Sequence, residues 1–191
     1  MEEIHEKEAV RERLIIAGLH ELEEHGLNDF SLRRVAVACE VSCAAPYRHF
    51  KSKDDLILSI IRYINRQWML LQEEIVSAFP GNVRKQVIEI SIATIRFWIA
   101  NPNFRAVLLV EPTVKNAPHF PERGEITDSL RRRIHTYCQE KDLTEEREQM
   151  IFFSVQSIVY GSVLLLGNGE IENTPATIRR IRSRLEQELP Y

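Results

Sequence analysis

Cysteine, glycine and long apolar runs are all scarce in this chain of 191 residues. Three cysteines cannot build the disulfide framework of a small secreted domain, and the seven glycines form no phosphate-binding loop. The most apolar run, 158–166, is about half the length that crosses a bilayer. The N-terminus is charged and lacks the apolar core of a signal peptide. We therefore expect a cytoplasmic protein without membrane contact.

A large charge of one sign is also missing, because the formal net charge is only −3. The whole-chain charge therefore does not indicate a nucleic-acid binder. Its distribution is more informative. Between Ser31 and Lys53 there are five basic residues and one acid, Glu40, which leaves a local excess of +4. An apolar content of 44% is enough for a sizeable core and excludes a disordered chain.

The sequence also lacks the common enzyme and metal-site motifs. It contains no nucleophile motif and no HExxH-type metal site. Cys39 and Cys43 are four residues apart, but two thiols alone make a poor metal site, and small buried cysteines are common. We expect no enzymatic activity, no cofactor and no bound metal.

Helical periodicity runs through nearly every segment, and no convincing strand alternation is present. The fold class is therefore expected to be all-α, with about nine helices bounded by Ser, Thr, Gly and Pro signals. Gly26 is expected to end the first helix as a left-handed cap. The expected helices cover 6–25, the segment capped by Ser31, 42–50, the segment from a cap at Ser52 to the break at 79–82, 83–100, 104–110, 121–141, 145–166 and 175–189.

Residues 31–50 have the pattern of a helix-turn-helix. A tight turn between two short helices holds the second at a steep angle to the first, so its N-terminal residues reach base edges in the major groove. Here the second helix is expected to begin with a cap at Ser42. Its small first turn, 43–45, lets the backbone approach DNA, and an alanine methyl can touch a thymine methyl.

The side chains around this motif suit a DNA backbone. Tyr47 and His49 can donate hydrogen bonds to phosphate oxygens. Lys53 lies in the first turn of the next helix, where free amides already favour an anion. Arg48 is the residue best placed to reach a base edge, with a position along the DNA backbone as the alternative, whereas Phe50 suits the core. The expected DNA-contacting residues are Ser31, Arg33, Arg34, Ser42, Ala44, Ala45, Tyr47, Arg48, His49, Lys51 and Lys53.

These residues resemble the TetR family of bacterial transcriptional regulators. The resemblance covers about the first third of the chain. It implies a DNA-binding domain over 8–68, and a domain over 69–191 that binds a small molecule and dimerises through its last two long helices. Operator release on ligand binding is also implied. The family commonly has glycine at the position of Glu40, and a glutamate in a left-handed turn costs about 1 kcal/mol. The resembling segments are 14–19 through Gly26, 30–36, 41–42, 47–51, Lys53 and Leu56.

Apolar stripes on the last two long helices predict a homodimer that matches a palindromic operator. The small residues Ser154, Ser157 and Gly161 let a partner helix approach closely. The alternative is that both stripes complete the core of a single chain. The expected interface residues are Phe152, Val155, Val159, Ile178, Ile181 and Leu185.

Aromatic residues of the C-terminal part are the candidates for a ligand cavity. Aromatic residues at helical spacing are more often plain core, so this assignment is the weaker one. An apolar or amphipathic small molecule suits such a lining, with the segment 112–121 as its entrance. The leading hypothesis is a ligand-released repressor; the alternative is a DNA-binding regulator whose body binds a protein partner. The candidate ligand residues are Trp68, Phe97, Trp98, Phe104, Glu111, His119, Phe153 and Tyr160.

Overall fold

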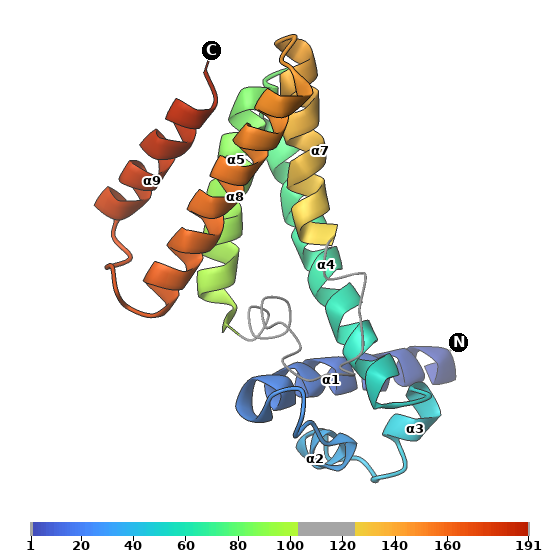
Figure 1. The fold of residues 1–191 in the computed structure, drawn as a ribbon. Helices are drawn as coiled ribbons and strands as arrows, with labels where there is room; N and C mark the ends of the chain where they lie inside the picture. The colour runs from blue at the N-terminus through green and yellow to red at the C-terminus, as the bar shows by residue number, and fades with distance from the viewer. Residues whose placement is uncertain (1, 103–124, 191) are drawn as a thin grey trace. The chain divides into compact units, whose positions relative to one another are not determined.

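The computed structural model of the chain describes residues 2–102 and 125–190, with side chains described for 8–102 and 127–190. Within these ranges the only regular elements are helices, which confirms the all-α fold class (Figure 1). The expected helix 104–110 and the residues Phe104, Glu111 and His119 lie outside the described residues. The elements are α1 Glu2–His25, α2 Leu32–Ala38, α3 Pro46–His49, α4 Lys53–Ala78, α5 Val83–Ala100, α7 Glu125–Glu140, α8 Glu145–Gly167 and α9 Pro175–Glu188.

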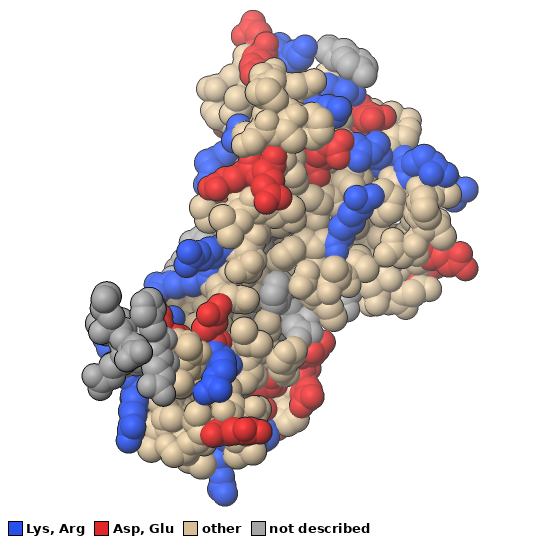
Figure 2. Space-filling view, turned by 180° about the vertical axis from the view of Figure 1, so that it is seen from behind, with Lys and Arg blue, Asp and Glu red and all other residues tan. Residues whose placement is uncertain are grey.

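The helices form two compact units. The first unit extends to Gln67 and contains α1, α2, α3 and the start of α4. The second begins at Trp68 and takes in the rest of α4 together with α5, α7, α8 and α9. Basic and acidic side chains are interspersed on the face drawn in Figure 2, so the net charge of −3 does not come from one acidic field there.

The core of the first unit forms where α1 crosses the start of α4. Gly18 makes this crossing possible, because a Cβ at that position would lie 2.9 Å from Ile60 Cδ1 and 3.3 Å from Leu56 Cδ2. Phe50, which follows α3, is 2% exposed and closes the core, as its sequence context predicted. Both α2 and α3 pack against α1 of this core. The fully buried residues here include Leu14, Val35, Ala36, Leu56, Ile57, Ile60 and Ile61.

Local capping signals set most helix boundaries. Gly26 has φ +70° and its N–H donates to Leu22 O, which confirms the predicted left-handed cap. Ser31 Oγ accepts a hydrogen bond from Arg34 N, and Ser52 Oγ accepts one from Asp55 N at 3.1 Å. Both predicted serine caps are therefore confirmed.

The third helix differs from its prediction. It begins at Pro46, not at Ser42, and the residue before it, Ala45, makes no side-chain cap. Residues 43–45 form a turn in which Ala45 N–H donates to Ser42 O at 2.8 Å. Proline has no amide donor and a fixed φ, so it suits the first helical position better than a position further along the helix. The predicted Ser42 cap was wrong for this reason.

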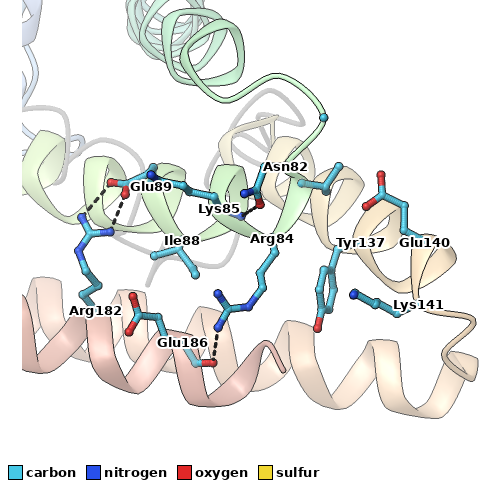
Figure 3. Close-up of a pocket in the computed structure, with 12 residues that line it drawn as sticks. Asn82, Arg84, Lys85, Ile88, Glu89, Tyr137, Glu140, Lys141, Arg182 and Glu186 are labelled. Carbon is cyan, nitrogen blue, oxygen red and sulfur yellow. Dashed lines mark hydrogen bonds and ion pairs between the residues drawn. The ribbon is translucent and has the colours of Figure 1, made fainter. Parts of the chain in front are cut away.

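The second unit is built around α5, whose described contacts reach α7, α8 and α9. Val87, Ile90 and Ile95 are completely buried along its length. The last helix is held by an ion pair that joins α9 to α5. Arg182 donates to both carboxylate oxygens of Glu89, at 2.6 and 2.8 Å (Figure 3).

The end of the chain is fastened at the same place. Arg84 donates to the backbone carbonyl of Glu186 (Figure 3). It also donates to the carbonyl of Leu189, and Tyr137 Oη donates to Pro190 O at 2.6 Å. Tyr137 is 1% exposed, and its burial raises the pKa of the phenol. The pocket of about 460 Å³ around these residues is therefore crossed by structural contacts between α5, α7 and α9.

Replacing Glu89 by glutamine is expected to destabilise the protein by about 1–3 kcal/mol at pH 7, because Arg182 then loses its charged acceptors. The hydrogen bonds from Arg182 lower the pKa of Glu89 below its ordinary value of 4.5. The pair therefore contributes its full stability above pH 4.5 and loses it as the pH falls through the lowered pKa. Urea unfolding between pH 7 and pH 3.5 should show the difference between the two proteins shrinking.

The matched control is Glu188→Gln on α9, the helix that also carries Arg182. Glu188 pairs with Arg184, whose side chain is 60% exposed, so this pair lies at the surface. Its loss is expected to cost about 0.5 kcal/mol or less. Equal effects of the two substitutions at every pH would contradict a special role for Glu89.

Candidate nucleic-acid interface

The helix-turn-helix is tied to α1 by a buried carboxylate, Glu21. This side chain is 7% exposed and accepts hydrogen bonds from Ser31 N at 2.9 Å and from Arg34 Nε at 2.8 Å. Arg34 also contacts Asp29. The hydrogen bond to Glu21 raises the pKa of Arg34, so the guanidinium stays charged. Of the expected DNA-contacting residues, Ser31 and Arg34 thus both fix the start of α2.

Most of the other expected contacts lie on the surface of the first unit. Tyr47 is 64% exposed. His49 and Lys53 are half-buried: the His49 ring lies beside Phe50, and Lys53 Nζ lies 5.7 Å from the centre of the Phe30 ring. These two contacts limit the positions available to His49 and Lys53. The expected contacts that are exposed are Arg33, Ser42, Ala44, Tyr47, Arg48 and Lys51, while Ser31 and Ala45 are half-buried.

The turn between α2 and α3 keeps a left-handed residue although that residue is glutamate. Glu40 has φ +56°. Its N–H donates to Val37 O, and Val41 N–H donates to Ala36 O, both at 3.0 Å. Together these bonds form a Schellman motif that ends α2. The turn therefore follows the geometry that glycine would favour. The strained residue is exposed just before residues 42–50, which we call the recognition segment.

Replacing Glu40 by glycine is expected to stabilise the protein by about 0.5–1 kcal/mol. Glycine removes the left-handed strain, and part of the gain is offset by the greater freedom of the unfolded chain. Glu40→Gln is the control, because it keeps the strain and removes the charge. Both variants should bind DNA more tightly at low salt, and only the glycine variant should gain stability in urea unfolding. If the glutamine variant is as stable as the glycine variant, the gain in stability comes from the loss of charge and not from the relief of backbone strain.

The two cysteines at the turn have different surroundings. Cys39 is buried, its Sγ donates to Arg13 O at 3.3 Å, and burial raises the pKa of its thiol. A protonated, buried thiol reacts poorly, so Cys39 serves packing. Cys43 is exposed, and both thiols are free. Among the described residues, no group of three or more His, Cys, Asp or Glu is placed to hold a metal ion.

Residues 14–60 match the family model described as "Bacterial regulatory proteins, tetR family". The chain carries the DNA-binding domain of the TetR family. The matched segment contains α1 from Leu14, the whole helix-turn-helix and the start of α4. Residues 14–60 thus form a TetR-type DNA-binding domain, which indicates a DNA-binding transcriptional regulator. No curated protein gives a significant match to it.

Solved structures share the fold over nearly the whole chain. A TetR-family regulator from Marinobacter aquaeolei VT8 has a TM-score of 0.73 at 16% identity, covering 99% of this chain and 98% of its own. FadR from Bacillus subtilis, solved with stearoyl-CoA, has 0.72 at 18%, covering 93% and 96%. The multidrug binding protein EbrR, solved with malachite green, has 0.63 at 17%, covering 95% and 98%. At these identities the likeness concerns the fold.

The candidate ligand residues of this TetR-type chain fall into different environments. Trp68 and Trp98 are 1% and 3% exposed, and Phe97 lies between them with ring-centre distances of 5.3 and 5.8 Å. Tyr160 is half-buried and its hydroxyl lies 3.1 Å from Thr127 Oγ1. Phe153 is 72% exposed on α8, so it does not line a cavity within the chain. That assignment is corrected because the side chain points to solvent.

The expected dimer residues of α8 and α9 turn mostly inward. Four of them are at most 9% exposed and belong to the core of the chain itself, where a partner cannot reach them. The apolar surface of α8 lies on its opposite face. The sequence does not distinguish the two faces, because α8 is apolar on both. The inward residues are Val155, Val159, Ile181 and Leu185; Phe152 lies under Arg131 and Ile178 is half-buried.

Proposed function

We propose that the chain is a repressor that binds a palindromic operator as a homodimer and leaves it when a small apolar or amphipathic molecule binds. The observation that carries this proposal is the joining of a TetR-type DNA-binding domain to a helical unit with an exposed apolar helix face. A two-fold dimer presents two recognition segments, as a palindromic site requires. Cytoplasmic location follows from this role.

The dimer is expected to form through the exposed face of α8. Met150, Phe153 and Leu164 are 54%, 72% and 53% exposed. They share helical spacing with the small residues Ser157 and Gly161, which allow close approach of a second helix. We call these five residues the α8 stripe.

An apolar stripe on a soluble regulator marks a contact surface. By length and composition alone α8 could also span a bilayer. It packs instead against α5, α7 and α9, so a partner helix accounts for the stripe better than lipid does.

The effector is expected to contact the aromatic cluster of Trp68, Phe97 and Trp98. Trp68 Nε1 is buried and finds no hydrogen-bond acceptor in the described part of the chain. An unmet buried donor costs about 1–3 kcal/mol, which a bound acceptor relieves. Two fold neighbours were solved with stearoyl-CoA and with malachite green, both large molecules with extended apolar parts. An apolar molecule with a hydrogen-bond acceptor fits this cluster.

The test has two stages. The purified protein is first used to select binding sequences from random duplex DNA, and the selected sites should be palindromic. A long-chain acyl-CoA and malachite green are then titrated into the complex, with DNA release followed by fluorescence anisotropy and binding followed by tryptophan fluorescence. Selection of non-palindromic sites contradicts the homodimer. If neither probe binds and a protein partner releases the DNA instead, the result would favour the alternative, a DNA-binding regulator whose body binds a protein partner.

A further inference from the structure

The turn that enters α3 presents an apolar surface with little hydrogen-bonding capacity. Cys43 and Ala44 are exposed and Ala45 is half-buried, whereas Pro46 is buried. In a helix-turn-helix, residues at this place are directed at base edges in the major groove. None of these four has the paired donors or acceptors with which Arg, Asn and Gln distinguish guanine and adenine.

The next longer polar side chains along the chain are Tyr47 and Arg48, in α3. Arg48 is the first long cationic residue, four positions beyond Ala44, and its N–H donates to Ala45 O at 3.0 Å. Tyr47 precedes it and is exposed, with a hydroxyl suited to phosphate. The turn 43–45 therefore has only a thiol and alanine methyl groups to offer the bases.

Thymine is the base that presents an apolar group, its C5-methyl, in the major groove. We propose that Ala44 and Cys43 read thymine methyl groups in each operator half-site. A 5-methylcytosine carries the same methyl group in the groove, so it is accepted better than cytosine at the same position. The proposal rests on the function proposed above, because such contacts exist only on a specific operator.

The DNA side of the test uses the operator selected from random duplexes. Each thymine of a half-site is replaced in turn by deoxyuridine, which removes the methyl group and keeps the base pairing. Each contacted thymine is expected to lose about four-fold in affinity, the factor for one buried CH₂-sized group. In a duplex that carries cytosine at that position, replacing the cytosine by 5-methylcytosine should raise the affinity by a similar factor. Replacing each guanine by 7-deazaguanine removes the N7 acceptor that an arginine can contact. The resulting loss of affinity therefore reports separately on Arg48.

The protein side uses Ala44→Gly and Cys43→Ser in a double-mutant cycle with the same duplexes. At the thymine that Ala44 contacts, the glycine variant should bind thymine and deoxyuridine equally. Cys43→Ser should remove the preference at its own thymine. Arg48→Ala should keep both thymine preferences even where its overall affinity falls. Urea unfolding of each variant verifies that the domain is folded.

The outcomes separate the two proposals. Equal binding of thymine and deoxyuridine at every position overturns methyl readout while leaving operator binding in place. A thymine preference that survives unchanged in both the Ala44 and the Cys43 variants overturns the residue assignment. A chain that selects no DNA sequence at all contradicts the proposed function, and methyl readout with it.

Discussion

Replacing Phe153 by glutamate is expected to convert the protein from a dimer into a folded monomer. Phe153 is the most exposed residue of the α8 stripe, at 72%, and the charge would be buried without a partner in a helix–helix interface. The monomer itself should keep its stability, because the side chain is mostly exposed in the single chain. Sedimentation velocity measures the assembly state, and urea unfolding at low protein concentration measures the fold.

Operator affinity should fall with the dimer. A dimer engages its second half-site as an intramolecular event, so losing it costs about 100-fold or more in affinity for a palindromic site. Binding to an isolated half-site should change little. Met69→Glu is the matched control, since Met69 is an exposed methionine on α4, at 52%, outside the stripe. A Phe153→Glu protein that stays dimeric and binds the operator normally would place the interface elsewhere.

The boundaries of most helices could be predicted because their signals are local. A serine at an N-cap or a glycine in a left-handed turn acts within three or four residues, so Ser31, Ser52 and Gly26 identify their helix ends without knowledge of the fold. Pro46 competes with the signal at Ser42. The proline decides the start of α3, because only the first turn tolerates its missing amide donor.

The inward face of a helix was harder to predict from the sequence, because it depends on residues that are distant in the chain. In α8 the apolar positions occupy both faces, so spacing alone does not separate Val155, in the core, from Phe153, at the surface. Glu21 had a recognisable signal: it shares a helix face with Leu14 and Gly18, where a carboxylate needs a partner. That Arg34 is the partner follows only from the packing of α1 against α2.

Removing the phosphate anchors is expected to weaken DNA binding by a similar factor on every sequence. Tyr47→Phe removes one hydroxyl and His49→Ala one ring donor, and each lost hydrogen bond should cost about 3–10-fold in affinity. Tyr47 is 64% exposed, so the phenylalanine variant should fold as the parent does. Anisotropy titrations against the operator and against a scrambled duplex measure both affinities, and their ratio should stay nearly constant.

Lys53→Gln separates charge from hydrogen bonding at the same surface. Lys53 is the first residue of α4, a 26-residue helix whose free N-terminal amides add to the attraction for a phosphate. Neutralising one phosphate contact should reduce the slope of log affinity against log salt by about 0.9, whereas Tyr47→Phe should leave the slope unchanged. Lys141→Gln, an exposed lysine of the second unit, should change neither quantity. A Lys53→Gln protein with the parental salt slope, together with unchanged affinity in Tyr47→Phe and His49→Ala, would mean that DNA meets another face of the domain.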